Sequence, residues 1–186
     1  MSLPVTFDST TVDYGLISFG GTASTVVVDP TLSTNKVAKV IKNAPETWAG
    51  TTVTGAAELG FSPAIPFTAT ERKMNVRVWS PTAGIPVRLK VEVSGQPTQS
   101  VETEALTTVA NGWQTMEFNF NNQAAGTAAF NAAFPYNKAS IFFNFGVAGS
   151  GQTYYFDDMK FGASLGVASF EASNIRMYPN PTSIPV

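Results

Sequence analysis

The chain has 186 residues, of which 11 are Lys or Arg and 13 are Asp or Glu, and it contains neither histidine nor cysteine. The absence of these two residue types excludes a Ser-His or Cys-His nucleophile pair, a disulfide and an ordinary zinc site. A net charge of −2 gives no basic field for nucleic acid, and no apolar run has the length of a membrane span. We therefore expect neither nucleic-acid binding nor membrane insertion.

Most of the sequence has the pattern of β-strands. Short runs of β-branched and aromatic residues alternate with clusters of Gly, Pro, Asn and Ser. The Ala-rich stretch 124–133 is expected to be a loop, because Gly126 and Asn131 interrupt it. The number and spacing of the strands predict an all-β fold, a two-sheet β-sandwich with jelly-roll topology. The expected strands are 3–8, 14–19, 23–28, 36–42, 50–56, 64–68, 74–80, 86–94, 99–106, 113–120, 139–146 and 153–161.

Acidic residues end the first expected strand and lie inside the last. Asp8 closes the first, whereas Asp157 and Asp158 follow an aromatic run in the last. A buried unpaired carboxylate is costly, and calcium relieves that cost by accepting carboxylate and carbonyl oxygens together. If the two strands lie close together, these acids predict a calcium site completed by the loop 29–36. The alternative is that one acid caps a turn and the other pairs with Lys160 or Arg72.

A tryptophan lies in the loop before the Thr-rich strand. Trp48 follows Pro45 and Glu46 in this loop. Loops at the ends of a sandwich commonly carry binding residues. We therefore expect Trp48 to contact a ligand.

The expected strand 74–80 alternates cleanly between apolar and other residues. Met74, Val76 and Val78 are predicted to face the core, which turns Arg77 and Trp79 to the outer face. The alternative is that Trp79 packs beneath a loop while the charges are merely solvated.

The next strand has the same alternation and adds Arg88 and Glu92 to the expected outer face. A tryptophan, two arginines and a glutamate on one face suit a saccharide, because the ring covers the C–H face of a pyranose and the polar groups hold its hydroxyls. Trp113 follows a turn and is expected either on this face or as an edge cap. Phe143 and Phe145 are expected in the core.

An asparagine lies in the middle of the expected strand 139–146. Asparagine is disfavoured at such a position, so Asn144 is a candidate to offer its amide to a ligand. Carboxylate-only glycoside hydrolysis requires two acids across a cleft. Glu102 and Glu104 are the nearest approach to such a pair, but they lack the third acid of family-sixteen jelly-roll glucanases. We expect no catalytic residues, with a glycoside hydrolase or polysaccharide lyase as an alternative.

Five stretches, taken in order, carry a resemblance to a known family. They are 3–8, 35–42 with 46–50, 76–90, 109–113 and 149–158. Together they resemble the carbohydrate-binding jelly-roll domains, galactose-binding-like in fold, that accompany secreted polysaccharide-degrading enzymes of Bacteroidetes, laminarinases included. The resemblance implies a structural calcium held by Asp8 and by either Asp157 or Asp158.

The end of the chain has a different composition. Tyr178-Pro179-Asn180-Pro181 resembles the opening of the C-terminal sorting domain with which Bacteroidetes export proteins. We therefore expect a binding domain at 3–165, followed at 166–186 by a linker and the start of a sorting domain. The resemblance implies a secreted or cell-surface protein, and a Pro-rich tail without special meaning is the alternative.

Taken together, the sequence predicts a non-catalytic module that binds a polysaccharide, with a β-glucan as the first candidate, and that targets a catalytic domain in the same parent chain. An acidic glycan is the alternative ligand, because the arginines on the expected face favour carboxylate and sulfate groups. An adhesin or spacer without a sugar site is the alternative from another class. The expected sugar-binding residues are Trp48, Arg77, Trp79, Arg88, Glu92 and Asn144.

Overall fold

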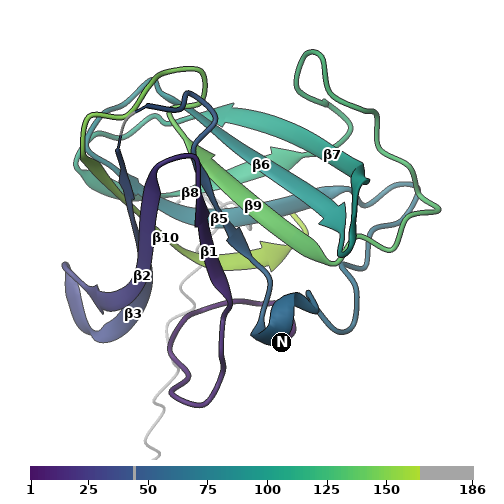
Figure 1. Ribbon diagram of the computed structural model, residues 1–186, viewed down its shortest axis with the longest axis horizontal. Coiled ribbons are helices and arrows are strands. Elements are labelled where there is room, and N and C mark those ends of the chain that lie inside the picture. Colours follow the sequence, from purple (N-terminus) through teal and green to yellow (C-terminus); the bar gives the residue numbers. More distant parts are fainter. Residues whose placement is uncertain (44, 164–186) are drawn as a thin grey trace, which may run out of the picture.

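The computed structural model describes residues 1–43 and 45–163, which form a two-layer β-sandwich (Figure 1). The first sheet has the strand order β1-β4-β9-β6-β7 and the second has the order β2-β3-β10-β5-β8, with five antiparallel strands in each. This architecture confirms the predicted all-β sandwich with jelly-roll topology. The strands are β1 (Leu16–Phe19), β2 (Thr22–Asp29), β3 (Leu32–Lys42), β4 (Gly50–Val53), β5 (Lys73–Ser80), β6 (Pro86–Val93), β7 (Gln96–Leu106), β8 (Gly112–Asn119), β9 (Lys138–Phe143) and β10 (Gln152–Phe161).

Two expected strands do not form in the described residues. The segment 3–8 contributes only an isolated bridge between Val5 and Met159, and 64–68 is a loop. Both segments contain a proline, which cannot donate to a strand ladder. The stretch 124–133 is irregular, as expected. The predicted linker and sorting segment at 166–186 lies outside the described residues.

The core lies between the two sheets and follows the alternation that the sequence predicts. Each fully buried aliphatic or aromatic side chain contributes about 1.5–3 kcal/mol through its removal from water. No helix in the described part of the chain is long and apolar enough to cross a membrane. Core residues with no exposed surface include Met74, Val76 and Val78 on β5, Val87, Leu89 and Val91 on β6, and Phe156 on β10.

The strands β5 and β6 follow one another in sequence but belong to different sheets. The expectation that their outward residues share one face is therefore wrong. The short connection 81–85 carries the chain from the second sheet to the first, whereas the sequence pattern resembles an ordinary hairpin. Outward residues of β5 and of β6 consequently lie on opposite faces of the sandwich.

Candidate functional site

The outer face of the first sheet carries two phenylalanines on either side of a glycine. Phe19 on β1 is the cross-strand partner of Gly50 on β4. A Cβ atom at Gly50 would lie 2.7 Å from Phe19 Cζ and 2.8 Å from Phe142 Cδ1, the latter on β9. Because Gly50 has no side chain, the two rings meet above it, with centroids 5.4 Å apart and planes at 69°.

Trp48 extends this aromatic surface from the loop between β3 and β4. Its indole stacks on Phe19 with a centroid distance of 6.1 Å and an interplanar angle of 16°. The residue is 48% exposed. A ring that is supported by a neighbouring ring and open to solvent can stack on the C–H face of a sugar.

Phe145 also joins this surface, and its expected place in the core is wrong. Asn144 has a φ of 48°, so the alternation of β9 ends at Phe143. Phe145 is therefore turned to the same side as Phe142, with ring centroids 5.7 Å apart. The guanidinium carbon of Arg88 lies 3.5 Å from the Phe145 centroid, a cation–π contact.

Arg88 links the aromatic half of the face to an ion-paired half. Its Nη1 lies 3.1 Å from Glu102 Oε2, and its Nη2 lies 3.1 Å from Glu104 Oε2. Further along β6, the Glu92 carboxylate contacts the ammonium groups of Lys90 and Lys138 at 2.6 and 3.4 Å. We call the surface formed by Phe19, Trp48, Arg88, Phe142 and Phe145 the aromatic face.

A buried lysine fixes the two loops that border the aromatic face. Lys42 is 1% exposed, and its Nζ donates to the carbonyl oxygens of Thr47 at 3.3 Å and of Phe143 and Asn144 at 2.9 Å. The Thr47 carbonyl also accepts from the Gly146 amide. Burial lowers the pKa of the Lys42 ammonium. Lys42 thus joins the Trp48 loop to the end of β9.

The sequence-predicted sugar residues divide between the two faces of the sandwich. Arg88 and Glu92 point outward from the first sheet, and Trp48 and Asn144 lie in loops at its edge. Arg77 and Trp79 point outward from β5, in the second sheet. Sequence reasoning did not include Phe19, Phe142 and Phe145 in the site. The alternation of inward and outward residues along their strands could have identified Phe19 and Phe142 as outward-facing.

Arg77 belongs to a cluster of charges on the outer face of the second sheet. Its Nη1 lies 3.1 Å from Asp29 Oδ2 and 3.4 Å from Asp157 Oδ2, and its guanidinium carbon lies 3.8 Å from the Trp113 ring centroid. Asn35 donates to both carboxylates, at 3.3 and 3.0 Å. Arg77 is therefore committed to holding two buried acids.

The two acids of this cluster have opposite pKa shifts. Burial raises the pKa of Asp29, but hydrogen bonds from Thr31, Asn35 and Arg77 outweigh that effect and lower it to about 2. For Asp157, burial is the dominant cause, and it raises the pKa despite the bond from Asn35 and the charge of Arg77. Asp157 Oδ1 is buried without a hydrogen-bond partner.

The predicted calcium ligands can be compared with this arrangement. Asp8 Oδ1 accepts from the Lys36 amide at 3.0 Å, and Asp158 pairs with Lys160 at 3.0 Å. Among residues 1–43 and 45–163, no three acidic side chains gather at one point. The partnerless oxygen of Asp157 fits a cation ligand, and amide and carbonyl oxygens of the neighbouring loop would have to complete the shell.

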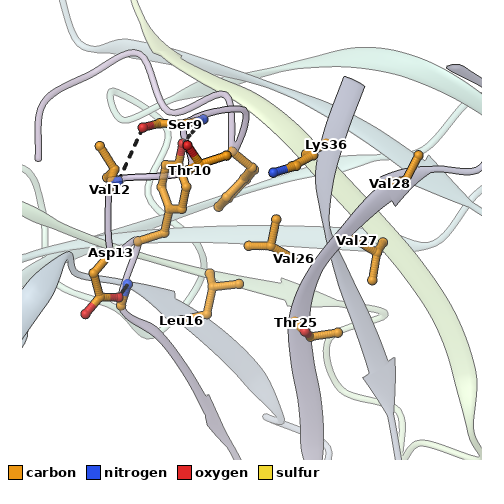
Figure 2. Close-up of a pocket in the computed structure, with 13 residues that line it drawn as sticks. Ser9, Thr10, Val12, Asp13, Leu16, Thr25, Val26, Val27, Val28 and Lys36 are labelled. Carbon is orange, nitrogen blue, oxygen red and sulfur yellow. Dashed lines mark hydrogen bonds between the residues drawn. The ribbon is translucent and has the colours of Figure 1, made fainter. Parts of the chain in front are cut away.

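A hollow of about 730 Å³ opens elsewhere, between the loop 9–15 and the edge strand β2 (Figure 2). Two of its polar groups serve the loop itself: Ser9 Oγ accepts from the Val12 amide, and Asp13 Oδ1 accepts from the Gly15 amide. The two rings that line it, Phe7 and Tyr14, are 0% and 9% exposed. The hollow therefore offers no open ring for stacking.

Comparisons with known proteins find similar folds in carbohydrate-binding modules. The chain is similar to the family 11 carbohydrate-binding module of a cellulosomal cellulase from Clostridium thermocellum, with 15% identity over 86% of this chain and 93% of that one, and a TM-score of 0.52. It is also similar to a family 22 xylan-binding domain from Paenibacillus barcinonensis, with 13% identity over 85% and 90% of the two chains and a TM-score of 0.50.

A larger protein contains a similar fold. An arabinose-bound family 51 α-L-arabinofuranosidase matches 84% of this chain at 13% identity with a TM-score of 0.56, and this chain spans only 25% of it. No family model matches the sequence, and neither does any curated protein. At these identities the likeness shows the fold.

Proposed function

We propose that this domain is a non-catalytic carbohydrate-binding module that binds a β-linked polysaccharide on its aromatic face. The observation that carries the proposal is the half-exposed Trp48 ring, supported by Phe19 and continuous with Phe142 and Phe145. Phe142 is only 7% exposed and supports the other rings, whereas Trp48, Phe19 and Phe145 keep open surface that can stack on sugar C–H faces. The Arg88 and glutamate groups beside them can bond hydroxyls.

The similar folds support a β-glucan as the first ligand to test and xylan as the second. A family 11 module of similar fold, TM-score 0.52, was solved with a β-1,3-1,4-mixed-linked tetrasaccharide, and the similar family 22 domain is described as xylan-binding. Since the fold also occurs within a longer arabinofuranosidase, we propose that the module directs a catalytic domain of the same parent chain to its polymer, in a secreted or cell-surface protein.

The arrangement of acids favours binding over hydrolysis. Glycoside hydrolysis requires one carboxyl group as proton donor and a second as nucleophile or base. On the aromatic face and its ion-paired border, Glu102 and Glu104 are held by Arg88, and Glu92 is held by two lysines. No free carboxyl pair is left among the described residues of this face.

Trp48→Ala is expected to weaken binding to lichenan about tenfold, because stacking interactions of this kind contribute about 1 kcal/mol or more. Affinity electrophoresis on lichenan, laminarin and xylan gels measures the change. Leu59→Ala is the matched control, because Leu59 is 75% exposed and belongs neither to the aromatic face nor to the loop 29–36.

Binding by the wild type together with unchanged binding by Trp48→Ala would move the site away from the aromatic face. A wild type that binds none of these polymers, nor an anionic algal glycan, would favour the spacer or adhesin. Release of reducing ends or unsaturated products would replace the module with an enzyme.

We further propose that calcium binds at Asp157 and Asp8, with oxygens of the loop 29–36. Support comes from the buried, partnerless Asp157 Oδ1 and from Asp8, which contacts the same hairpin through the Lys36 amide. Asp158, paired with Lys160, is expected to contribute less.

Calcium is expected to raise the melting temperature of the wild type, since a ligand that binds only the folded state stabilises it, and to leave Asp157→Asn unchanged. Melting curves in calcium and in EGTA measure the shift, and Asp158→Asn is the matched control. Terbium luminescence sensitised by nearby aromatic rings gives a second readout. Identical melting in both buffers, without terbium luminescence, would rule out the ion.

A further inference from the structure

The outer face of the second sheet also carries an ordered row of side chains. Thr25, Lys39, Tyr155, Trp79 and Trp113 are successive cross-strand partners on β2, β3, β10, β5 and β8. The row crosses the entire sheet, and each of its residues is partly or fully exposed. We call these five residues the second row.

The three rings of the second row are adjacent and lie at steep angles to one another. Trp79 and Tyr155 have centroids 5.5 Å apart at 79°, and Trp113 and Tyr155 have centroids 6.3 Å apart at 52°. Trp113 and Tyr155 lie on the two outer strands of the three, yet their centroids are only 6.3 Å apart, so the three rings form a compact cluster. A cluster of this size suits the C–H face of a sugar ring within a chain.

The polar atoms of the second row are available to a ligand. Lys39 Nζ, Trp79 Nε1 and Tyr155 Oη have no hydrogen-bond or ion-pair partner within residues 1–43 and 45–163. Trp113 differs, because its Nε1 donates to Thr31 Oγ1 at 3.0 Å and thereby ends the row against the β2–β3 hairpin. Apolar rings interspersed with free donors complement a glycan, which presents C–H faces and hydroxyl groups in turn.

We propose that the second row is a second glycan-binding strip, so that the module binds polysaccharide on both faces of the sandwich. The occupant is a hydroxyl-rich sugar chain of the same class that is proposed for the aromatic face, and the inference rests on that proposed function for its choice of probe. A stable protein interface needs roughly 20–30 residues a side, whereas this row is narrow. Two strips on opposite faces allow one module to bridge two polymer chains.

The three tryptophans make the proposal directly testable. Their indole N–H groups give separate NMR signals, which single Trp→Phe variants assign, and the full chain is titrated with the β-1,3-1,4-linked tetrasaccharide and with xylohexaose. We expect the signals of Trp48 and Trp79 both to shift. The Trp79 shift should persist in Trp48→Ala, and the Trp48 shift should persist in Trp79→Ala.

A second variant avoids dependence on a tryptophan substitution. Lys39→Met, which removes the ammonium donor, is expected to weaken binding at the second row about fivefold, since one hydrogen bond contributes about 1 kcal/mol, and to leave the Trp48 titration unchanged. If both faces bind, the wild type should cross-link lichenan chains and make the mixture turbid. Trp48→Ala and Trp79→Ala, which each keep only one binding face, should leave the mixture clear.

The possible results separate the two proposals. A Trp48 signal that shifts while Trp79 stays fixed would overturn the second strip and leave the aromatic face intact. A Trp79 signal that shifts alone would support the strip and overturn the aromatic face. Fixed signals at both would overturn both, and a Trp79 shift that follows protein dilution rather than sugar would assign the row to self-association and overturn the strip.

Discussion

Methionine in place of Arg77 is expected to lower the free energy of unfolding by about 3 kcal/mol at neutral pH. The side chains of Asp29 and Asp157 are 0% and 3% exposed, and both contact the Arg77 guanidinium. Removing the cation leaves two buried carboxylates whose remaining hydrogen bonds cannot offset the cost of burial. Denaturant unfolding at several pH values measures the loss.

The way in which the stability loss of Arg77→Met depends on pH distinguishes the lost charge from lost packing. The folded-state pKa of Asp29, about 2, is below its ordinary value of 3.8, so its stabilising contribution is present above about pH 4 and is lost as the pH falls towards 2. Without Arg77 the acids are expected to take up protons at higher pH. The difference in unfolding free energy between the variant and the wild type should therefore become smaller as the pH falls from neutral into the acid range.

Lys160→Met provides the matched control for Arg77→Met. Its ammonium pairs with Asp158, but their side chains are 44% and 35% exposed, and exposed pairs contribute about 0–1 kcal/mol. Little change is expected at any pH. A loss for Arg77→Met that is below about 1 kcal/mol, or that does not vary with pH, would contradict the role assigned to the guanidinium.

The strands and the core could be predicted because they depend on local alternation. On β5, Met74, Val76 and Val78 are buried while Arg77 and Trp79 point outward, as period-two patterning requires. This pattern specifies which face of a strand is buried. It contains no information on which sheet the strand joins.

Because alternation does not show which sheet a strand joins, the set of residues that form the candidate site could not be predicted. The connection 81–85 takes the chain to the other layer, so Arg77 and Arg88 lie on opposite faces although they are close in sequence. A single residue has a similar effect at β9, where the positive φ of Asn144 turns Phe145 outward. The hydrophobic pattern indicates neither the crossing from one sheet to the other at 81–85 nor the positive φ of Asn144.

The cluster of charges around Arg77 could not be predicted either, because it joins residues that are far apart in the sequence. Asp29 and Asp157 are far apart in sequence and lie on strands that are not neighbours, yet Asn35 and Arg77 contact both. The expectation that Asp157 requires a partner follows from the cost of burying a charge. That Arg77 is such a partner follows only from the strand order.

Lys42→Met is expected to lower the melting temperature by about 5–10 °C and to weaken lichenan binding together with it. Methionine fills the volume but removes the ammonium from three carbonyl oxygens. The Asn144 and Thr47 oxygens keep the backbone amides of Val147 and Gly146 as donors. The buried Phe143 oxygen loses the Lys42 ammonium, which costs about 1–3 kcal/mol, partly offset because the charge is no longer buried. For a chain of this size, 1 kcal/mol shifts the melting temperature by about 2–4 °C.

Lichenan binding should weaken because Lys42 joins the Trp48 loop to the end of β9. The next residue after Asn144 is Phe145, whose ring contacts Arg88 on the aromatic face. A loosened loop must be ordered again on each encounter with the polymer, and that entropy cost reduces the affinity. Lys36→Met is the matched control, because only the backbone of Lys36 contacts Asp8. If Lys42→Met melts and binds as the wild type does, the two loops are held by other contacts and the ammonium is not what positions Trp48.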